Sequence, residues 1–267
     1  MIEVSVVEIN SFQEKIFDWW KKNKRELPWR NTTNPYYIMV SEIMLQQTQV
    51  TRTIEKYLLF IEKYPKIEDL ANAPTADVLK IWSGLGYNRR ALWLQQAAKQ
   101  LLELKEFPKK SEELRKLKGI GPYTSKSILI FAFNLDIATV DTNIRRILIA
   151  EGFADEFTSE KELFSIAEKL LPKSKSRDWH NALMDYGALY LTAVNTGIKP
   201  TRTQTKFKQS NRFYRGKIIK HLIQNKEASF QELIEICGLN YSEGKEIISS
   251  LVKDELIKER KKKYTLP

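Results

Sequence analysis

The sequence predicts a mostly α-helical protein with a small helical domain near its C-terminus. Through the first two hundred residues, apolar positions recur three and four apart, which is the spacing of one helix face, and the alternating runs typical of strands are rare. After a polar interruption near residue 192, helical spacing resumes over a short, basic region. The length of 267 residues is enough to bury a hydrophobic core without disulfides or metals.

The first predicted helix begins at a capping-box pattern, in which Ser11 is followed three residues later by Glu14, and it ends before Pro28. Phe12 and Ile16 lie on its apolar face, so it should pack against a core. Further helices are expected at 38–48, 51–63, 75–82, 88–104, 111–118, 122–133, 141–150, 160–171 and 178–190, with prolines separating several of them.

A connector is predicted over 193–213, where the chain lacks apolar periodicity and is rich in Thr, Asn, Lys and Gln. Beyond it, Ser229 and Glu232 form a capping box, a turn follows at Gly238, and a second apolar-faced helix comes after. The ending LIKERKKKYTLP suits two short strands around a basic tip, which would complete a winged helix. Such a domain is about as often a protein-contact module as a DNA reader. The predicted domains are 1–192, the connector, and 214–267.

Charge and cysteine content narrow the function classes. The chain carries a net charge of +11, and residues 201–267, with 15 basic and 8 acidic side chains, hold +7 of it. This suggests an anionic partner, most often nucleic acid, while an evenly solvated basic surface stays open as the alternative. The single cysteine, Cys237, excludes a disulfide framework, a multi-cysteine zinc site and a cysteine-ligated iron–sulfur cluster. We expect no bound metal of these kinds.

No membrane or secretion signal is recognisable in the sequence. No run approaches the roughly 18 apolar residues that span a bilayer. The opening MIEVSVVEIN mixes acids into its apolar residues, whereas a signal peptide is basic and then apolar. We therefore expect a cytoplasmic protein that does not bind membranes.

The segment LKGIGPYTSKSIL, residues 117–129, predicts two helices joined by a tight glycine turn. Gly119 and Gly121 permit positive φ and a close approach of another backbone, and the helix starting at Pro122 presents unpaired N–H groups. Such a turn is suited to hold a phosphate. For a glycine turn alone, an ordinary αα-hairpin is the commoner interpretation.

Downstream, IATVDTNIRRIL places Asp141 between a β-branched run and a helix. The commonest reason for an acid there is N-capping. Together, however, the glycine hairpin and Asp141 about twenty residues later resemble the helix–hairpin–helix DNA glycosylases. Three further segments, LPWRNTTNPYYIMVSEIMLQQTQV at 27–50, GLGYNRRALWL at 84–94 and NALMDYGALYLT at 181–192, resemble the MutY-type adenine glycosylases over residues 10–192. The resemblance implies an all-α, two-lobed helix–hairpin–helix glycosylase fold, followed here by the winged-helix-like domain.

The resemblance also implies roles for individual residues. Glu42 matches the acid that protonates adenine, and Asp141 matches the carboxylate that faces the oxocarbenium-like sugar. An enclosed pocket can keep one carboxyl protonated while a second stays ionised beside developing positive charge. The other positions that match are Tyr123 and Asn143 in the catalytic pocket; Trp29, Arg30 and Asp185 at the adenine pocket; Gln47, Thr48, Leu85 and Tyr87 around the opposing base; and Gly119, Gly121 and Thr124 on DNA.

Taken without their motifs, several of these residues have plainer interpretations. Trp29 and Tyr87 are equally suited to be core aromatics, Arg30 to be a salt-bridge partner, and Gln47 to be a solvated side chain. The motif context reverses that preference most strongly for Glu42 and Asp141.

The chain departs from the family in three ways. Tyr123 stands where the bifunctional branch carries a Schiff-base lysine, so we expect a monofunctional enzyme, with Lys126 able to support at most weak strand cleavage. Leu191 stands where most MutY-type proteins have the first of four cluster cysteines. We also expect the usual 8-oxoguanine-reading domain to be lacking. We expect no cofactor; a sodium or potassium ion at the hairpin carbonyls stays open.

The sequence thus predicts a monomeric repair enzyme that excises adenine opposite 8-oxoguanine or guanine from double-stranded DNA. One alternative keeps the chemistry and removes thymine or uracil opposite guanine. Another is a non-catalytic module that only binds DNA or a repair partner.

Overall fold

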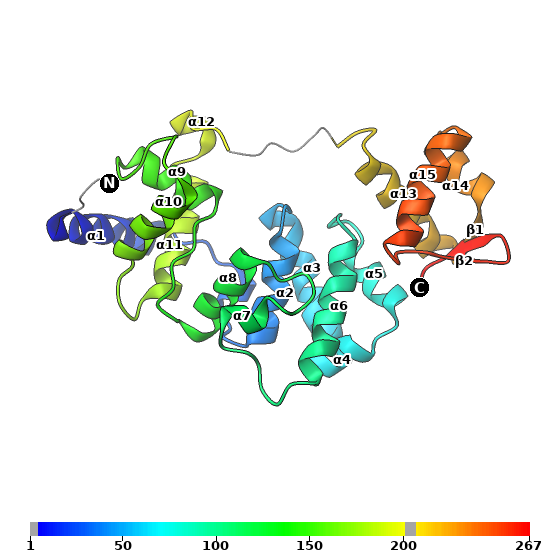
Figure 1. The fold of residues 1–267 in the computed structure, drawn as a ribbon, viewed down its shortest axis with the longest axis horizontal. Helices are drawn as coiled ribbons and strands as arrows, with labels where there is room; N and C mark the ends of the chain where they lie inside the picture. The colour runs from blue at the N-terminus through cyan, green and yellow to red at the C-terminus, as the bar shows by residue number, and fades with distance from the viewer. Residues whose placement is uncertain (1–4, 201–206) are drawn as a thin grey trace. The chain divides into compact units, whose positions relative to one another are not determined.

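The computed structural model describes residues 5–200 and 207–267, and helices dominate this part of the chain (Figure 1). The chain divides into two compact units. Unit 1 comprises Met1–Met39, Pro108–Lys116 and Ile120–Thr203, and unit 2 comprises Val40–Phe107, Leu117–Gly119 and Gln204–Pro267. Part of the predicted connector, residues 201–206, lies outside the described residues.

Unit 1 is built from helices that surround one apolar core. Its elements are α1 (Val6–Asn23), the 3₁₀ turn η1 (Pro28–Arg30), the start of α2 (Pro35–Leu45), α7 (Ser111–Leu114), α8 (Pro122–Phe133), α9 (Thr142–Ala150), α10 (Glu160–Lys169), α11 (Ser176–Leu189) and α12 (Ala193–Thr196). The short α12 falls inside the predicted connector, because Thr192 caps it by accepting a hydrogen bond from the amide of Asn195.

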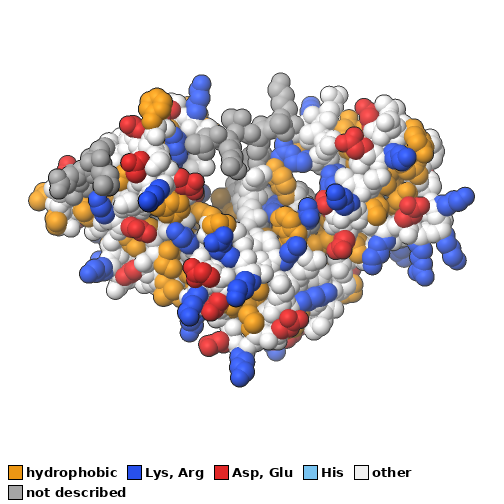
Figure 2. Space-filling view, viewed as in Figure 1, with side chains coloured by type: hydrophobic (Ala, Val, Ile, Leu, Met, Phe, Trp, Pro, Cys, Tyr) orange, Lys and Arg blue, Asp and Glu red, His pale blue; other side chains and the backbone are white. Residues whose placement is uncertain are grey.

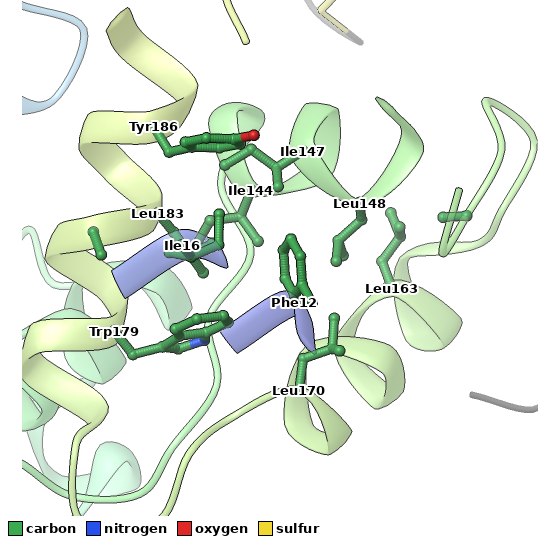
Figure 3. Packing of buried hydrophobic residues seen from close by; sticks show 12 residues of the cluster. Phe12, Ile16, Ile144, Ile147, Leu148, Leu163, Leu170, Trp179, Leu183 and Tyr186 are labelled. Carbon is green, nitrogen blue, oxygen red and sulfur yellow. The ribbon is translucent and has the colours of Figure 1, made fainter. Parts of the chain in front are cut away.

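The core of unit 1 joins α1 to α9, α10 and α11 (Figure 3). Phe12 and Ile16 point from α1 toward Ile144 and Leu148 of α9, and Trp179 closes the cluster from α11. The Phe12 and Trp179 rings meet edge to face, with centroids 5.6 Å apart. These contacts confirm the core-facing first helix.

The start predicted for that first helix is wrong. The helix begins at Val6, and Ser5 with Glu8, rather than Ser11 with Glu14, forms the capping box. Ser11 lies inside the helix and is exposed. Both pairs have the same spacing, but only Ser5 has the extended backbone that a cap requires.

Unit 2 packs a second set of helices around α6. Its elements are the end of α2, α3 (Val50–Lys63), α4 (Ile67–Asn72), α5 (Thr75–Trp82) and α6 (Arg89–Leu102). The helices α4 and α5 both pack on α6, and Trp82, Phe60 and Leu94 are fully buried. The prediction missed the six-residue α4, whereas α5 and α8 have their predicted bounds.

The C-terminal domain, residues 207–267 of unit 2, has the predicted winged-helix pattern. It contains α13 (Asn211–Asn225), β1 (Glu227–Ser229), α14 (Phe230–Cys237), α15 (Tyr241–Lys253), β2 (Lys258–Arg260) and β3 (Lys263–Thr265). The strands form an antiparallel sheet in the order β1-β3-β2, with Ala228 and Glu259 both opposite Tyr264. The Ser229–Glu232 capping box is confirmed. Figure 2 shows Lys and Arg side chains gathered at this end of the chain.

None of the helices in residues 5–200 and 207–267 combines the length and the apolar character that a bilayer crossing requires.

Candidate active site

The two predicted catalytic acids belong to different units. Asp141 begins α9 in unit 1, whereas Glu42 lies in the part of α2 that belongs to unit 2.

Asp141 is the N-cap of α9. Its backbone is extended, and its carboxylate accepts a hydrogen bond from the amide of Ile144 at 2.7 Å and another from the side-chain amide of Asn143 at 3.1 Å. The plainer interpretation from sequence, an N-capping acid, is thus confirmed. It does not compete with the catalytic role, because a carboxylate fixed at a helix N-terminus is also oriented.

The pKa of Asp141 is set by two opposing effects. Burial raises the pKa above its ordinary value, whereas the hydrogen bonds from Ile144 and Asn143 and the charge of Arg146 lower it. Burial is the larger effect, so the net direction is upward. This direction opposes the expectation of an ionised Asp141, and the three neighbouring groups are what favour the charged form.

Arg146 connects this acid to the end of α11, and the sequence analysis assigned it no role. Its guanidinium donates to the side-chain oxygen of Asn143 at 2.7 Å, to the carbonyl of Gly187 at 2.7 Å and to the carbonyl of Leu191 at 2.5 Å. The only sequence signal was a basic residue on the apolar face of α9, three positions after Asn143. The carbonyl of Leu191, at the position that resembles a cluster cysteine, is therefore held by an arginine.

Gly187 explains why α9 and α11 approach so closely. A Cβ atom at this position would lie 2.8 Å from the Cβ of Asn143. The glycine inside the motif NALMDYGALYLT is therefore needed for the packing that lets Arg146 reach α11.

His180 anchors the segment that leads into Asp141. Its Nδ1 lies 2.7 Å from the carbonyl of Ser176, and its Nε2 accepts a hydrogen bond from the amide of Thr139 at 3.3 Å. Burial lowers the pKa of His180 to about 4, so the ring is neutral at pH 7. The sequence analysis did not single out this residue.

Asp185 is fully buried in unit 1 and accepts hydrogen bonds from three side chains. Trp20 donates to it at 2.9 Å, Arg25 at 2.6 Å, and Arg30 at 2.7 and 2.9 Å. Burial raises its pKa, but Arg30 and Arg25 lower it by more, so the carboxylate is held in its charged form. The predicted pocket residues Arg30 and Asp185 thus form an ion pair that ties α11 to η1, where Trp29 is buried.

The glycine turn between α7 and α8 differs from its prediction at one position. Gly119 has a φ of +78°, and a Cβ there would lie 2.8 Å from the Cβ of Trp93, so only glycine fits. Gly121 is instead the extended N-cap of α8, a conformation open to any residue. Thr124 is 4% exposed, so its surroundings are those of a packing residue, and its contact with DNA stays a prediction.

Tyr123 and Lys126 lie in the first two turns of α8. Tyr123 is half-buried. The ammonium of Lys126 lies 4.3 Å from the ring centroid of Phe164 on α10, which is a cation–π geometry. The one lysine considered for strand cleavage is therefore engaged with an aromatic face inside unit 1.

In unit 2, the residues predicted to surround the opposing base flank a buried arginine, Arg90. Its terminal nitrogens donate to the carbonyls of Ile43, Met44, Gln46 and Gly86 at 2.6–3.0 Å and to the hydroxyl of Thr48 at 2.9 Å. Burial lowers the pKa of Arg90 to about 10. The side chain joins the end of α2, shortly after Glu42, to the turn before α6. Arg90 lies within the motif GLGYNRRALWL, but the resemblance implies no role for it.

Two of the predicted opposing-base residues have left-handed backbones. Gln47 has a φ of +55° and Tyr87 a φ of +47°, a region that residues with side chains rarely adopt. Gln47 is exposed and Tyr87 is half-buried, whereas Leu85 is 6% exposed. Such strain is common at functional sites, and it distinguishes Tyr87 from an ordinary core aromatic.

The residues present do not fit an iron–sulfur cluster. Cys237 is the only cysteine of the sequence, and it is buried in α14 of unit 2. Leu191 packs against the core of unit 1, and Phe207 and Phe213 pack edge to face in unit 2, with centroids 5.7 Å apart. In the described residues, no group of three or more His, Cys, Asp or Glu side chains is arranged to hold a metal ion.

Comparison with known proteins finds adenine DNA glycosylases among the relatives of this chain. It is 32% identical over 228 residues to an adenine DNA glycosylase of Mus musculus, covering 80% of this chain and 44% of the relative. It is 36% identical over 223 residues to an adenine DNA glycosylase of Buchnera aphidicola subsp. Baizongia pistaciae, covering 79% and 63%. The chain thus spans about half the length of these relatives.

Solved structures agree on the fold. A thermostable thymine-DNA glycosylase aligns with a TM-score of 0.65 and 28% identity, covering 71% of this chain and 90% of that one. The family model described as HhH-GPD superfamily base excision DNA repair protein matches residues 40–173, which include Glu42, the hairpin and Asp141. This chain belongs to the HhH-GPD superfamily of base excision DNA repair proteins.

Proposed function

We propose that this chain is a monofunctional DNA N-glycosylase that excises adenine mispaired with 8-oxoguanine or guanine from double-stranded DNA. The observation that carries the proposal is Glu42 within its motif, in a chain 32–36% identical to adenine DNA glycosylases over about 80% of its length. The target adenine leaves the base stack before reaction, because its glycosidic bond is inaccessible inside a duplex.

The chemistry needs one proton donor and one negative charge. Glu42 donates a proton to the extruded adenine, the glycosidic C–N bond breaks, and its electron pair leaves with the base. The carboxylate of Asp141 stabilises the oxocarbenium-like sugar. Water then adds to the anomeric carbon and loses a proton, which yields free adenine and an abasic site.

The surroundings of Asp141 support its proposed role in stabilising the sugar. Hydrogen bonds from Ile144 and Asn143 hold the carboxylate in one orientation, and Asn143 is itself fixed by Arg146. A preoriented charge needs little reorganisation when positive charge develops on the sugar. Burial, which raises the pKa of Asp141, also keeps water away from the carboxylate, so that its charge acts strongly once it is ionised.

The absence of strand cleavage is part of the proposal. A phenol at Tyr123 cannot form a Schiff base with the sugar, and the ammonium of Lys126 lies on the face of Phe164. We expect abasic product with an intact backbone, until heat or alkali cleaves it.

The decisive experiment identifies the released base. Duplexes containing A opposite 8-oxoguanine, A opposite G, T opposite G, U opposite G, and hypoxanthine are incubated with the full chain, and free bases are separated by chromatography. The proposal expects adenine from the first two duplexes. Release of thymine with adenine untouched would overturn it.

A matched variant separates catalysis from binding. Glu42→Gln removes the proton donor while keeping the shape of the side chain, so base release should stop and affinity for the duplex should stay within about twofold. If the parent chain releases no base from any duplex yet binds DNA, the non-catalytic alternative replaces the proposal.

The second candidate function is excision of thymine or uracil opposite guanine. The solved structure at 28% identity is described as a thymine-DNA glycosylase, and this chain covers 90% of it. The panel of duplexes discriminates between the two candidates directly, because they differ only in the base released.

A further inference from the structure

A cleft of about 330 Å³ lies in unit 2 between the turn before α6 and the C-terminal domain. On one side it is lined by Gln47 and Tyr87, which resemble residues that surround the opposing base. On the other side it is lined by Arg212 and Arg215 of α13. The family match ends at residue 173, so it does not extend to α13.

The cleft is strongly positive. Four arginines line it, whereas Asp254 is the single acidic residue among its lining residues. Asp254 is shared by two of the arginines, at 3.2 Å from Arg89 and 2.6 Å from Arg215. The Arg89–Asp254 pair fastens the C-terminal domain to the start of α6, and the four arginines leave the cleft with an excess of positive charge.

Two guanidinium groups lie over the ring of Tyr87. The guanidinium carbon of Arg90 lies 5.4 Å from the ring centroid, and that of Arg212 lies 5.2 Å from it. Arg212 also donates a hydrogen bond to the hydroxyl of Tyr87. The ring therefore has a fixed orientation on a strained backbone, and α13 contributes directly to that orientation.

These features fit a purine nucleotide better than a simple phosphate. The planar donors of an arginine match the adjacent O6 and N7 acceptors of guanine-type purines. The exposed amide of Gln47 adds a second hydrogen-bonding group at the same cleft.

We propose that α13 completes the site for the base opposite the excised adenine, with Arg212 as its specificity-determining residue for a guanine-type purine. This inference rests on the proposed function for the identity of the excised base, but its test requires no catalysis. In this proposal the C-terminal domain acts on DNA through α13.

The test measures affinity for two duplexes that differ only opposite adenine, one carrying guanine and the other an abasic site. Both are titrated in a Glu42→Gln background, so that no base is released. Arg212→Ala should weaken binding to the guanine duplex by about tenfold and leave the abasic duplex within twofold. Lys220→Ala, an exposed cation on the same helix, is the control and should leave the ratio between the duplexes unchanged.

Two conservative variants keep the test valid if Arg212→Ala misfolds. Arg212→Lys retains the charge but lacks the planar donors, so it should lose discrimination while keeping affinity for the abasic duplex. Tyr87→Phe removes only the hydroxyl that Arg212 contacts and should reduce discrimination by less than Arg212→Ala. Thermal melting confirms that each variant is folded.

Three results would overturn the inference. Equal loss on both duplexes would make Arg212 a backbone phosphate contact, and no loss on either would leave the cleft without a DNA role. Loss of discrimination in Lys220→Ala as well would indicate a general charge effect. If the parent discriminates between the duplexes but releases no adenine, the proposed function fails while this inference stands.

Discussion

Unit 1 buries the carboxylate of Asp185 and unit 2 buries the guanidinium of Arg90, so two side chains of opposite charge hold candidate residues in the two units. In unit 1, the carboxylate of Asp185 contacts the guanidinium groups of Arg25 and Arg30, so its negative charge is compensated by their positive charges. In unit 2, Arg90 is surrounded by neutral carbonyls, so its charge is solvated by dipoles. The pKa of Asp185 is lowered, which favours its charged form, and the pKa of Arg90 is also lowered, which disfavours its charged form.

This difference indicates that two buried charges with similar positioning roles are sensitive to different substitutions and conditions. An acid between two arginines depends on both signs of charge being present, so removal of one partner leaves buried charge behind. An arginine among carbonyls depends on the number and geometry of its donors. We therefore expect unit 1 to respond most strongly to loss of charge and to acid, and unit 2 to loss of hydrogen bonds.

The largest expected effect is in unit 1. Asp185→Asn leaves Arg25 and Arg30 without their counterion, and the free energy of unfolding should fall by about 3–5 kcal/mol. Urea unfolding at pH 7 measures the change. The control is Asp18→Asn, whose partner Lys21 is an exposed neighbour on α1, and it should change stability by less than about 1 kcal/mol. Equal effects at the two sites would show that burial of Asp185 does not matter.

Acid should destabilise unit 1 more than unit 2. The pKa of His180 is about 4 in the folded chain against 6.5 when unfolded, so the unfolded state binds the extra proton first. This contribution to stability is complete above pH 6.5, and about 3 kcal/mol of it is lost as the pH falls to 4. The pKa of Asp185 is also lowered, so its contribution is lost at still lower pH, as its carboxylate becomes protonated.

Amide hydrogen exchange between pH 7 and 4.5 checks this. Protection should fall in α9 and α11 of unit 1 while α5 and α6 keep theirs, because the lowered pKa of Arg90, about 10, lies far above this range. His180→Gln, which cannot titrate, should flatten the pH dependence of unit 1. An equal loss of amide protection in both units would contradict the expected difference between them in sensitivity to acid.

Arg90 should show the dependence on hydrogen bonds. Arg90→Lys keeps the positive charge but has three donors in place of five, so some carbonyls at the end of α2 lose their partner. We expect a loss of about 1–3 kcal/mol in the free energy of unfolding, measured by urea titration. If Arg90→Lys were neutral in stability, charge rather than donor geometry would be what this site requires.

The sequence predicted local features well and these buried charges poorly. The helices at 75–82 and 122–133 have their predicted bounds, because Pro74 before the first, Pro122 at the start of the second and the apolar spacing within each are local signals. Ser5 with Glu8 and Ser11 with Glu14 have the same spacing. Spacing alone cannot choose between the two pairs, so the predicted capping box was at the wrong one. Asp141 as the start of a helix was correct for the same local reason.

The roles of Arg90 and Arg146 could not be predicted, because their long-range partners include backbone carbonyls 41–47 residues away, which have no side-chain identity to recognise. Asp185 and Arg30 were assigned to the adenine pocket by resemblance, but their pairing across 155 residues is visible only in the fold. The roles of buried charges that hold loops are thus visible only in the contacts of the folded chain, whereas helices and their caps can be predicted from the sequence.

The smallest expected effect concerns a cation held neither by a carboxylate nor by carbonyls. Lys126 lies on the ring of Phe164, and Lys126→Met, which keeps the apolar stem, should reduce the free energy of unfolding by about 0.5–1 kcal/mol. If Lys126 acted as a Schiff-base nucleophile, borohydride would trap a covalent adduct between the parent chain and abasic DNA, and the variant would lose that adduct. We expect no adduct with either protein. An adduct with the parent alone would place Lys126 at the sugar and remove it from the aromatic face, because an ammonium must lose its proton and leave its cation–π partner before it attacks.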